Sequence, residues 1–245
     1  MIRTRNAVLA TAAIAALITG GTALAGPRDA HAQDQAFSIS QNVTADAVTV
    51  CNTDPVIATY HGTVNLTIPV VTLLANFQDE MQAAAAAGQS PHAAGAQNPD
   101  ITFTVSVPQG TQVGSGTVTN SSSLISNWWF SPNSEKTEMK VNLHLTQTDW
   151  QGLYTTYTSE KSNPLGHTIT IKIPYAVGAN NAADAARIAQ EQVTSTATVK
   201  FYTGGDTPSK VFTSAVASNP IASTPTDCFS NAPQRTTRWV DAETG

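Results

Sequence analysis

Apolar and polar residues alternate along several segments of this chain. In residues 63–68, for example, Val64, Leu66 and Ile68 are separated by threonine and asparagine. A period of two places alternate side chains on opposite faces of an extended strand. When many strands each have one apolar and one polar face, antiparallel sheets are the usual result. The same alternation recurs in residues 101–107, 138–145, 168–173 and 198–201.

Two segments depart from this alternation and have helical spacing instead. In residues 69–87 apolar side chains recur every three or four positions, Pro69 suits a helix start, and Gly88 can end the helix. In residues 181–193 the apolar stripe is weaker, but Asn180 or Asn181 can cap a helix. The sequence therefore predicts two amphipathic helices.

The order of these elements repeats once along the chain. Residues 63–70 (TVNLTIPV) resemble residues 168–175 (TITIKIPY), and each segment precedes a predicted helix and then a further strand. Duplication is one explanation; the chance likeness of two alternating strands is the other. We expect a mainly β (α+β) fold, an antiparallel β-sandwich-like domain with two amphipathic helices, arranged as two pseudo-repeated strand-helix-strand halves if the repeat is real.

The N-terminal residues have the layout of a secretory signal peptide. Two arginines are followed by an uncharged, mostly apolar run and then by small residues, with cleavage predicted after Ala25 or after Ala32. We therefore interpret residues 1–32 as a leader and residues 33–245 as a single exported β-rich domain. The run is too short to span a bilayer comfortably. The predicted location is extracytoplasmic: secreted, or associated with the cell envelope of a bacterium.

Cysteine count and charge narrow the chemistry further. Two cysteines in an exported chain predict one disulfide between Cys51 and Cys228. The net charge is −5 and no basic stripe is present, which excludes a nucleic-acid partner. The histidines lack the spacing of metal ligands, so we expect neither a metal nor another cofactor.

Aromatic residues give the main indication of a binding surface. Neighbouring side chains of a strand point to opposite faces, so one member of the consecutive pair Trp128 and Trp129 should face away from the core. Exposed aromatic rings stack on sugars, enter lipid interfaces or anchor protein partners. Core packing is the competing explanation for each single ring, including Phe130.

Three functions are compatible with these features. The first is an exported, non-catalytic binding protein whose helix-covered sheet encloses a cleft for a lipid or other apolar molecule. The alternative is a structural or adhesive surface domain that contacts protein or polysaccharide through flat sheet faces. A secreted hydrolase is least favoured, with Glu135, Glu138, Asp149 and Glu160 as its available carboxylates. The residues expected to line an apolar cleft are Val70, Leu74, Phe77, Trp128, Trp129 and Phe130.

Overall fold

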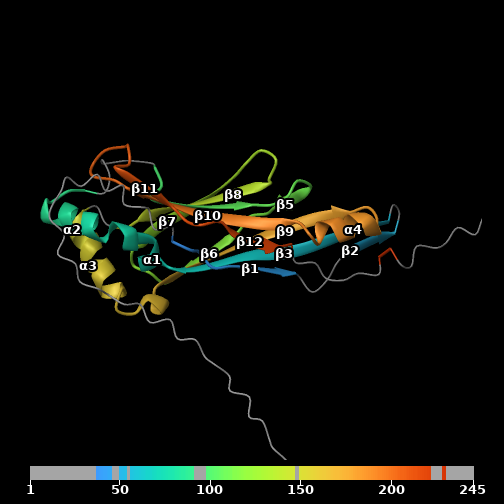
Figure 1. Ribbon diagram of the computed structural model, residues 1–245, viewed down its shortest axis with the longest axis horizontal. Coiled ribbons are helices and arrows are strands. Elements are labelled where there is room, and N and C mark those ends of the chain that lie inside the picture. The colour runs from blue at the N-terminus through green and yellow to red at the C-terminus, as the bar shows by residue number, and fades with distance from the viewer. Residues whose placement is uncertain are drawn as a thin grey trace, which may run out of the picture. The chain divides into compact units, whose positions relative to one another are not determined.

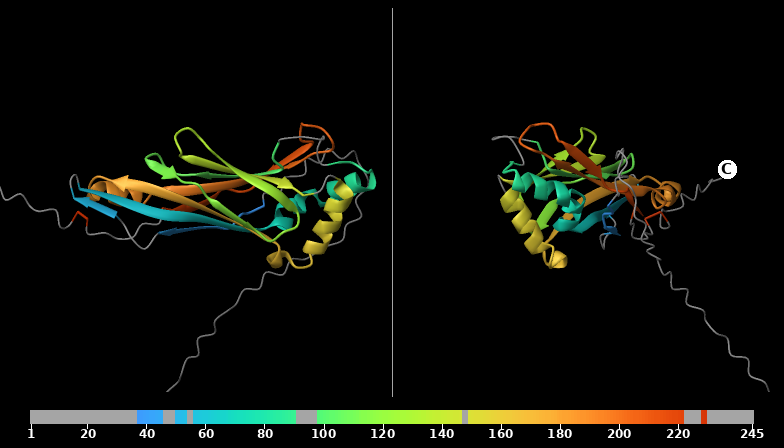
Figure 2. Two further views of the ribbon diagram at one scale, coloured as in Figure 1. Left: turned by 180° about the vertical axis from the view of Figure 1, so that it is seen from behind. Right: turned by 60° about the vertical axis from the view of Figure 1, so that its left-hand side comes forward.

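Two antiparallel sheets, each of six strands, face one another (Figures 1 and 2). The computed structural model describes residues 37–45, 50–53, 56–90, 98–146, 149–221 and 228–229. Sheet A consists of β1 (Gln41–Ala45), β2 (Val50–Thr53), β3 (Val56–Pro69), β5 (Thr111–Val113), β6 (Thr117–Asn120) and β9 (Thr168–Ala179). Sheet B consists of β4 (Ile101–Ser106), β7 (Ile125–Pro132), β8 (Glu138–Leu145), β10 (Gln192–Phe201), β11 (Lys210–Thr213) and β12 (Ala217–Pro220).

The hydrophobic core lies between the two sheets. Along β9 every second side chain, from Ile169 to Ala179, is buried, and β4 and β10 alternate in the same way. The apolar positions of both sheets belong to one continuous cluster. The alternation in the sequence therefore reports burial between sheets, and the predicted β-sandwich-like α+β fold is confirmed.

The two resembling segments lie next to each other in sheet A. Residues 63–69 of β3 pair antiparallel with residues 168–174 of β9, so that the first residue of each lies opposite the last of the other and Leu66 lies opposite Ile171. The strands that follow in each half, β4 and β10, pair antiparallel in sheet B. These strands are therefore related by an approximate two-fold axis that passes between Leu66 and Ile171.

The first predicted helix is present, with an interruption. It consists of α1 (Val70–Leu74), a single 3₁₀ turn η1 (Ala75–Phe77) and α2 (Gln78–Ala86). Gly88 has φ +64°, while its N–H bonds to the Ala85 carbonyl and that of Gln89 to the Ala84 carbonyl. This is a Schellman ending, which is the role expected of the glycine.

The second predicted helix is shorter than expected, and a third was not predicted. Helix α4 (Ala182–Ile188) begins at Asn181, whose side chain accepts a hydrogen bond from the Asp184 N–H, but it ends before β10 takes over at Gln192. Helix α3 (Trp150–Glu160) and a 3₁₀ turn η2 (Pro164–Gly166) follow β8. Helices α1, α2 and α3 gather at one end of the sheets and α4 lies at the other (Figures 1 and 2).

A disulfide joins Cys51 of β2 to Cys228, with 5.5 Å between their Cα atoms and a sequence separation of 177. This is the predicted pairing, and such bonds are typical of proteins outside the reducing cytoplasm. Every helix within the described ranges is too short or too polar to span a bilayer. The predicted leader, residues 1–32, lies outside the described residues.

Candidate functional site

Three of the six residues expected to line an apolar cleft are in the core. Val70, Leu74 and Phe77 are 0%, 2% and 1% exposed. The ring of Phe77 stacks on Phe201 at 5.4 Å between centroids and meets Phe212 edge-on at 4.7 Å. These side chains belong to the core cluster and are in contact with protein rather than with an open groove; Phe77 of η1 packs against β10 and β11 of sheet B.

The other three residues lie on β7, the outer strand at the opposite side of sheet B. Trp128 pairs with the core residue Leu143, and Phe130 pairs with the core residue Val141. Trp128 is nevertheless 37% exposed, since β7 is the edge strand of sheet B. β10 and β7 are three strand spacings apart, about 14 Å. The structure therefore does not bring the two groups of predicted residues together.

Trp129 is the member of the pair that faces away from the core. Its partner in the ladder is Asn142, on the outer face of sheet B. Its ring lies against the imidazole of His144, with 5.0 Å between ring centroids. The ring is half-buried by these neighbours, so its position is fixed while part of its surface remains open.

Trp129 begins a row of polar side chains that crosses the whole of sheet B. Strand register places one residue of each strand in line, and we call this set the Trp129 row: Trp129, Asn142, Thr102, Thr198 and Thr213. At about 4.8 Å between neighbouring strands the row is about 19 Å long. The Thr102 hydroxyl donates to Asn142 Oδ1 at 3.1 Å, and the hydroxyls of Thr198 and Thr213 are 3.4 Å apart.

A buried carboxylate supports the Trp129 end of this row. Asp100 is 1% exposed, accepts a hydrogen bond from the Leu145 N–H at 2.9 Å, and lies 3.3 Å from Nδ1 of His144. The imidazole against which the Trp129 ring lies is therefore held in place by a carboxylate inside the sheet.

Asp100 also affects Tyr202. Burial is the main cause that raises the pKa of the Tyr202 hydroxyl above its ordinary value of 10.0, and the nearby Asp100 and Asp206 carboxylates raise it further.

Two of the four carboxylates that a hydrolase would need, Asp149 and Glu160, have structural roles. Asp149 caps α3 by accepting a hydrogen bond from the Gly152 N–H at 2.7 Å. Glu160, at the far end of the same helix and about 16 Å away by helix rise, accepts from the Ser122 hydroxyl and the Ser123 N–H, each at 2.6 Å. Of the remaining two, Glu135 lies in the turn between β7 and β8, and Glu138 is the first residue of β8.

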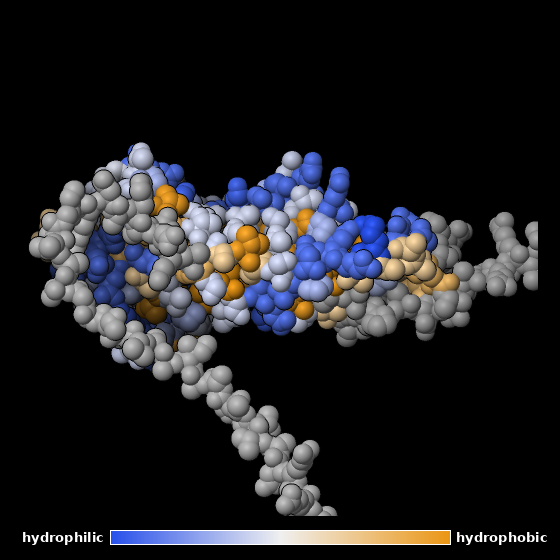
Figure 3. Space-filling view, in the orientation of Figure 1, coloured by the Kyte–Doolittle hydropathy of each residue, from blue (hydrophilic) through white to orange (hydrophobic). Residues whose placement is uncertain are grey.

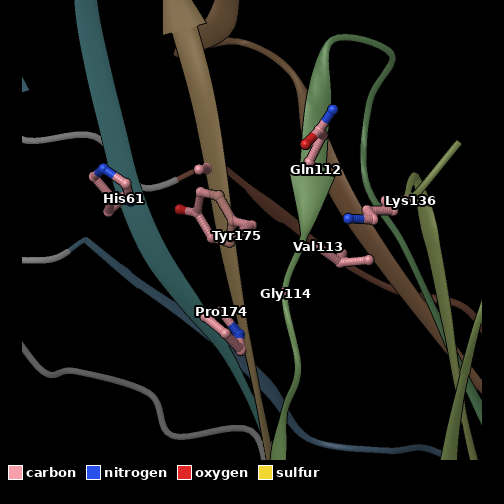
Figure 4. A pocket seen from close by; sticks show the side chains of 8 residues that line it. His61, Gln112, Val113, Gly114, Lys136, Pro174 and Tyr175 are labelled. Carbon is pink, nitrogen blue, oxygen red and sulfur yellow. The ribbon is translucent and has the colours of Figure 1, made fainter.

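A surface pocket of about 320 Å³ lies over sheet A (Figure 4). Its walls come from β3, β9 and β5, and the turn between β7 and β8 of the other sheet reaches it through Lys136. No sequence motif indicates this pocket, because its residues are far apart along the chain and meet only through strand pairing. The lining residues are His61, Gln112, Val113, Gly114, Lys136, Pro174, Tyr175 and Ala176.

Comparison with known proteins gives remote structural similarity only. No protein-family model matches the chain, and no curated protein does. A solved structure described as "pH-induced modulation of Streptococcus parasanguinis adhesion by Fap1 fimbriae" is 8% identical, with a TM-score of 0.27 over 78% of this chain and 98% of that one. The C-terminal domain of the Streptococcus agalactiae AgI/II polypeptide BspA is 10% identical, with a TM-score of 0.26 over 74% of this chain and 49% of that one. Function is therefore argued from the residues of this chain.

Proposed function

We propose that this protein is an exported, non-catalytic surface domain that contacts polysaccharide through the outer face of sheet B. The observation that carries the proposal is the Trp129 row, in which a fixed indole is followed by amide and hydroxyl groups in line across five strands. This develops the surface-contact interpretation of the sequence in preference to the apolar cleft.

The chemistry of the row suits a sugar chain better than an apolar ligand or a protein. An indole ring offers an apolar plane on which the C–H face of a sugar ring can stack. The threonine hydroxyls can both donate and accept hydrogen bonds, as sugar hydroxyls require. Asn142 is 7% exposed, and its amide is bonded to Thr102 and Ser131, so it holds the middle of the row in place. Protein interfaces instead centre on a cluster of large apolar anchors, and the row contains one such side chain.

The face is also rigid. Its strands are interior or paired members of a sheet whose other side is the core, so binding needs little ordering of the protein. On the side of the molecule seen in Figure 3, apolar residues occur as separate spots among polar ones. In the Trp129 row itself every side chain other than the indole is polar, which favours contact with a hydrated polymer over insertion into lipid.

The test compares two tryptophans on one strand. Binding of the purified exported domain to immobilised neutral and acidic polysaccharides would be measured for the wild type, Trp129→Ala and Trp128→Ala. Loss of a stacking plane is expected to weaken binding about tenfold in Trp129→Ala, whereas Trp128→Ala, on the opposite face, should bind as the wild type does. Circular dichroism and urea unfolding would confirm that both variants fold.

Two results would count against the proposal. Equal polysaccharide binding by Trp129→Ala and the wild type would remove the Trp129 row from the contact. Native mass spectrometry that finds a lipid or other apolar molecule bound to the protein from its own host would return support to the apolar-cleft interpretation.

A further inference from the structure

The polar side chains around the pocket over sheet A come from two places: a row of residues that runs across the strands of sheet A, and the turn between β7 and β8 of sheet B. His61, Ala176 and Gln112 lie side by side on β3, β9 and β5. Lys136 approaches from the turn between β7 and β8, and its carbonyl accepts a hydrogen bond from the Val113 N–H at 2.8 Å. Figure 4 shows His61 on one side of the pocket and Gln112 with Lys136 on the other. The backbone contact fixes Lys136 beside the sheet.

The floor of the pocket is apolar and remains open because of a glycine. Pro174 contributes its ring, and Gly114 lies opposite it on the neighbouring strand. A Cβ atom at Gly114 would stand 3.2 Å from Cγ of Pro174, which is tighter than ordinary contact. The volume of about 320 Å³ is at the lower end of the range for small-molecule sites, so one or two compact rings are the size of ligand that fits.

The pocket presents positive charge on an acidic protein. Among the described residues, Lys136 and His61 form no ion pair, as is also true of Lys172 and Lys200, whereas Lys140, Arg187 and Lys210 each have a carboxylate partner. Of these unpaired cations, Lys136 and His61 are the two that line the pocket. The whole chain has a net charge of −5. A lysine without a carboxylate partner at the wall of a concave site attracts an anion, and a site that also offers an amide and an apolar floor selects for more than charge.

We infer that this pocket binds the carboxylate of an acidic sugar, a uronate unit of a polysaccharide. The inference rests on the proposed function for the nature of the partner. Lys136 faces the carboxylate, Gln112 and His61 bond the ring hydroxyls, and Pro174 supports the C–H face of the ring. The N–H groups of Val113, Gly114 and Lys136 already donate to carbonyls, so these three are not free to hold a phosphate.

The experiment uses a matched pair of probes. A tetramer of α-1,4-linked galacturonic acid and its methyl ester, which keeps the rings and loses the charges, would be titrated into ¹⁵N-labelled protein and followed by NMR. The free acid should shift the amide signals of residues 112–114 and 174–176 and bind about tenfold more tightly than the ester. Raising the salt concentration should weaken binding of the free acid and leave binding of the ester unchanged.

Single substitutions then test the residues. Lys136→Gln and His61→Gln should each weaken binding of the acid about threefold or more, and Gly114→Ala should weaken both probes because its methyl group fills the floor. Lys161→Gln is the control, since it removes the same charge at the end of α3, among the helices at one end of the sheets, and should change nothing. Unchanged binding in Lys136→Gln would overturn the inference.

Other probes separate the inference from its rivals. Acetate that binds as tightly as the uronate, or a tetraglutamate peptide that binds more tightly, would show that the sugar is not recognised and would overturn it. If neutral polysaccharide binding depends on Trp129 while the uronate tetramer leaves the pocket signals unshifted, the inference about the pocket fails and the proposed function stands. If the uronate binds the pocket and Trp129→Ala has no effect on polysaccharide, the proposed role of the Trp129 row fails instead.

Discussion

Replacing Phe77 by alanine distinguishes a core residue from a ligand-lining one. Its ring is 1% exposed and packs on Phe201 at 5.4 Å and on Phe212 at 4.7 Å. Truncation of a buried phenylalanine costs about 3–5 kcal/mol, because transfer energy is lost and a cavity remains. For a domain of this size each kcal/mol lowers the midpoint of thermal unfolding by about 2–4 °C, so a fall of about 6–20 °C is expected.

The measurement is urea unfolding of the oxidised protein, followed by tryptophan fluorescence and by circular dichroism. Leu165→Ala is the control, since it also truncates a large apolar side chain but one that is 81% exposed, and its effect should stay within about 0.5 kcal/mol. A loss below about 1 kcal/mol in Phe77→Ala, with an unchanged denaturant slope, would refute the reasoning. It would mean that Phe77 borders open space, as the apolar-cleft interpretation requires.

Three further predictions concern the disulfide, a close approach and an alkaline limit. Serine at both Cys51 and Cys228 should lower the free energy of unfolding by at most about 5 kcal/mol, the loop-entropy value for a separation of 177, measured by urea unfolding against the oxidised wild type. Gly62→Ala should destabilise by about 1–3 kcal/mol, since its Cβ would lie 2.7 Å from a backbone carbonyl, whereas Gly205→Ala, with nothing within 4 Å, should not. Burial raises the pKa of Tyr202, so the unfolded chain loses this proton first above about pH 10 and stability should fall there; Tyr202→Phe should make that fall shallower in unfolding curves measured from pH 8 to 11.

The sequence predicted the parts of this fold that depend on neighbouring residues. The alternation identified β3, β4, β8, β9 and β10, and the capping asparagine identified the start of α4. Helix α3 was missed because threonine, tyrosine and glycine favour other conformations, although Trp150, Leu153 and Tyr157 recur at three and four residues and are buried in the structure. Asp149 before that stripe was the available signal for its start.

The candidate sites could not be predicted in the same way, because they depend on which strands pair. Asn142 and Thr198 are ordinary outward residues of their strands, and only the register through Thr102 places them in one row. Likewise, His61 and Gln112 become neighbours across β9 only once the order of sheet A is known. Periodicity gives the face on which a side chain lies but not its neighbour in the next strand.

The approximate two-fold axis explains where the pocket over sheet A can exist. Pro69 ends its strand, and Val70 begins helix α1 with its N–H bonded to the His167 carbonyl. Pro174 occupies the same place in the second segment, but Tyr175 and the residues after it continue the strand as far as Ala179, and α4 begins only at Ala182. After Pro69 the chain leaves the sheet as a helix, whereas after Pro174 it continues as a strand, and β5 pairs with this continuation. The pocket therefore lies where the two resembling segments differ in structure, at the part of β9 that continues where the first segment turns into a helix.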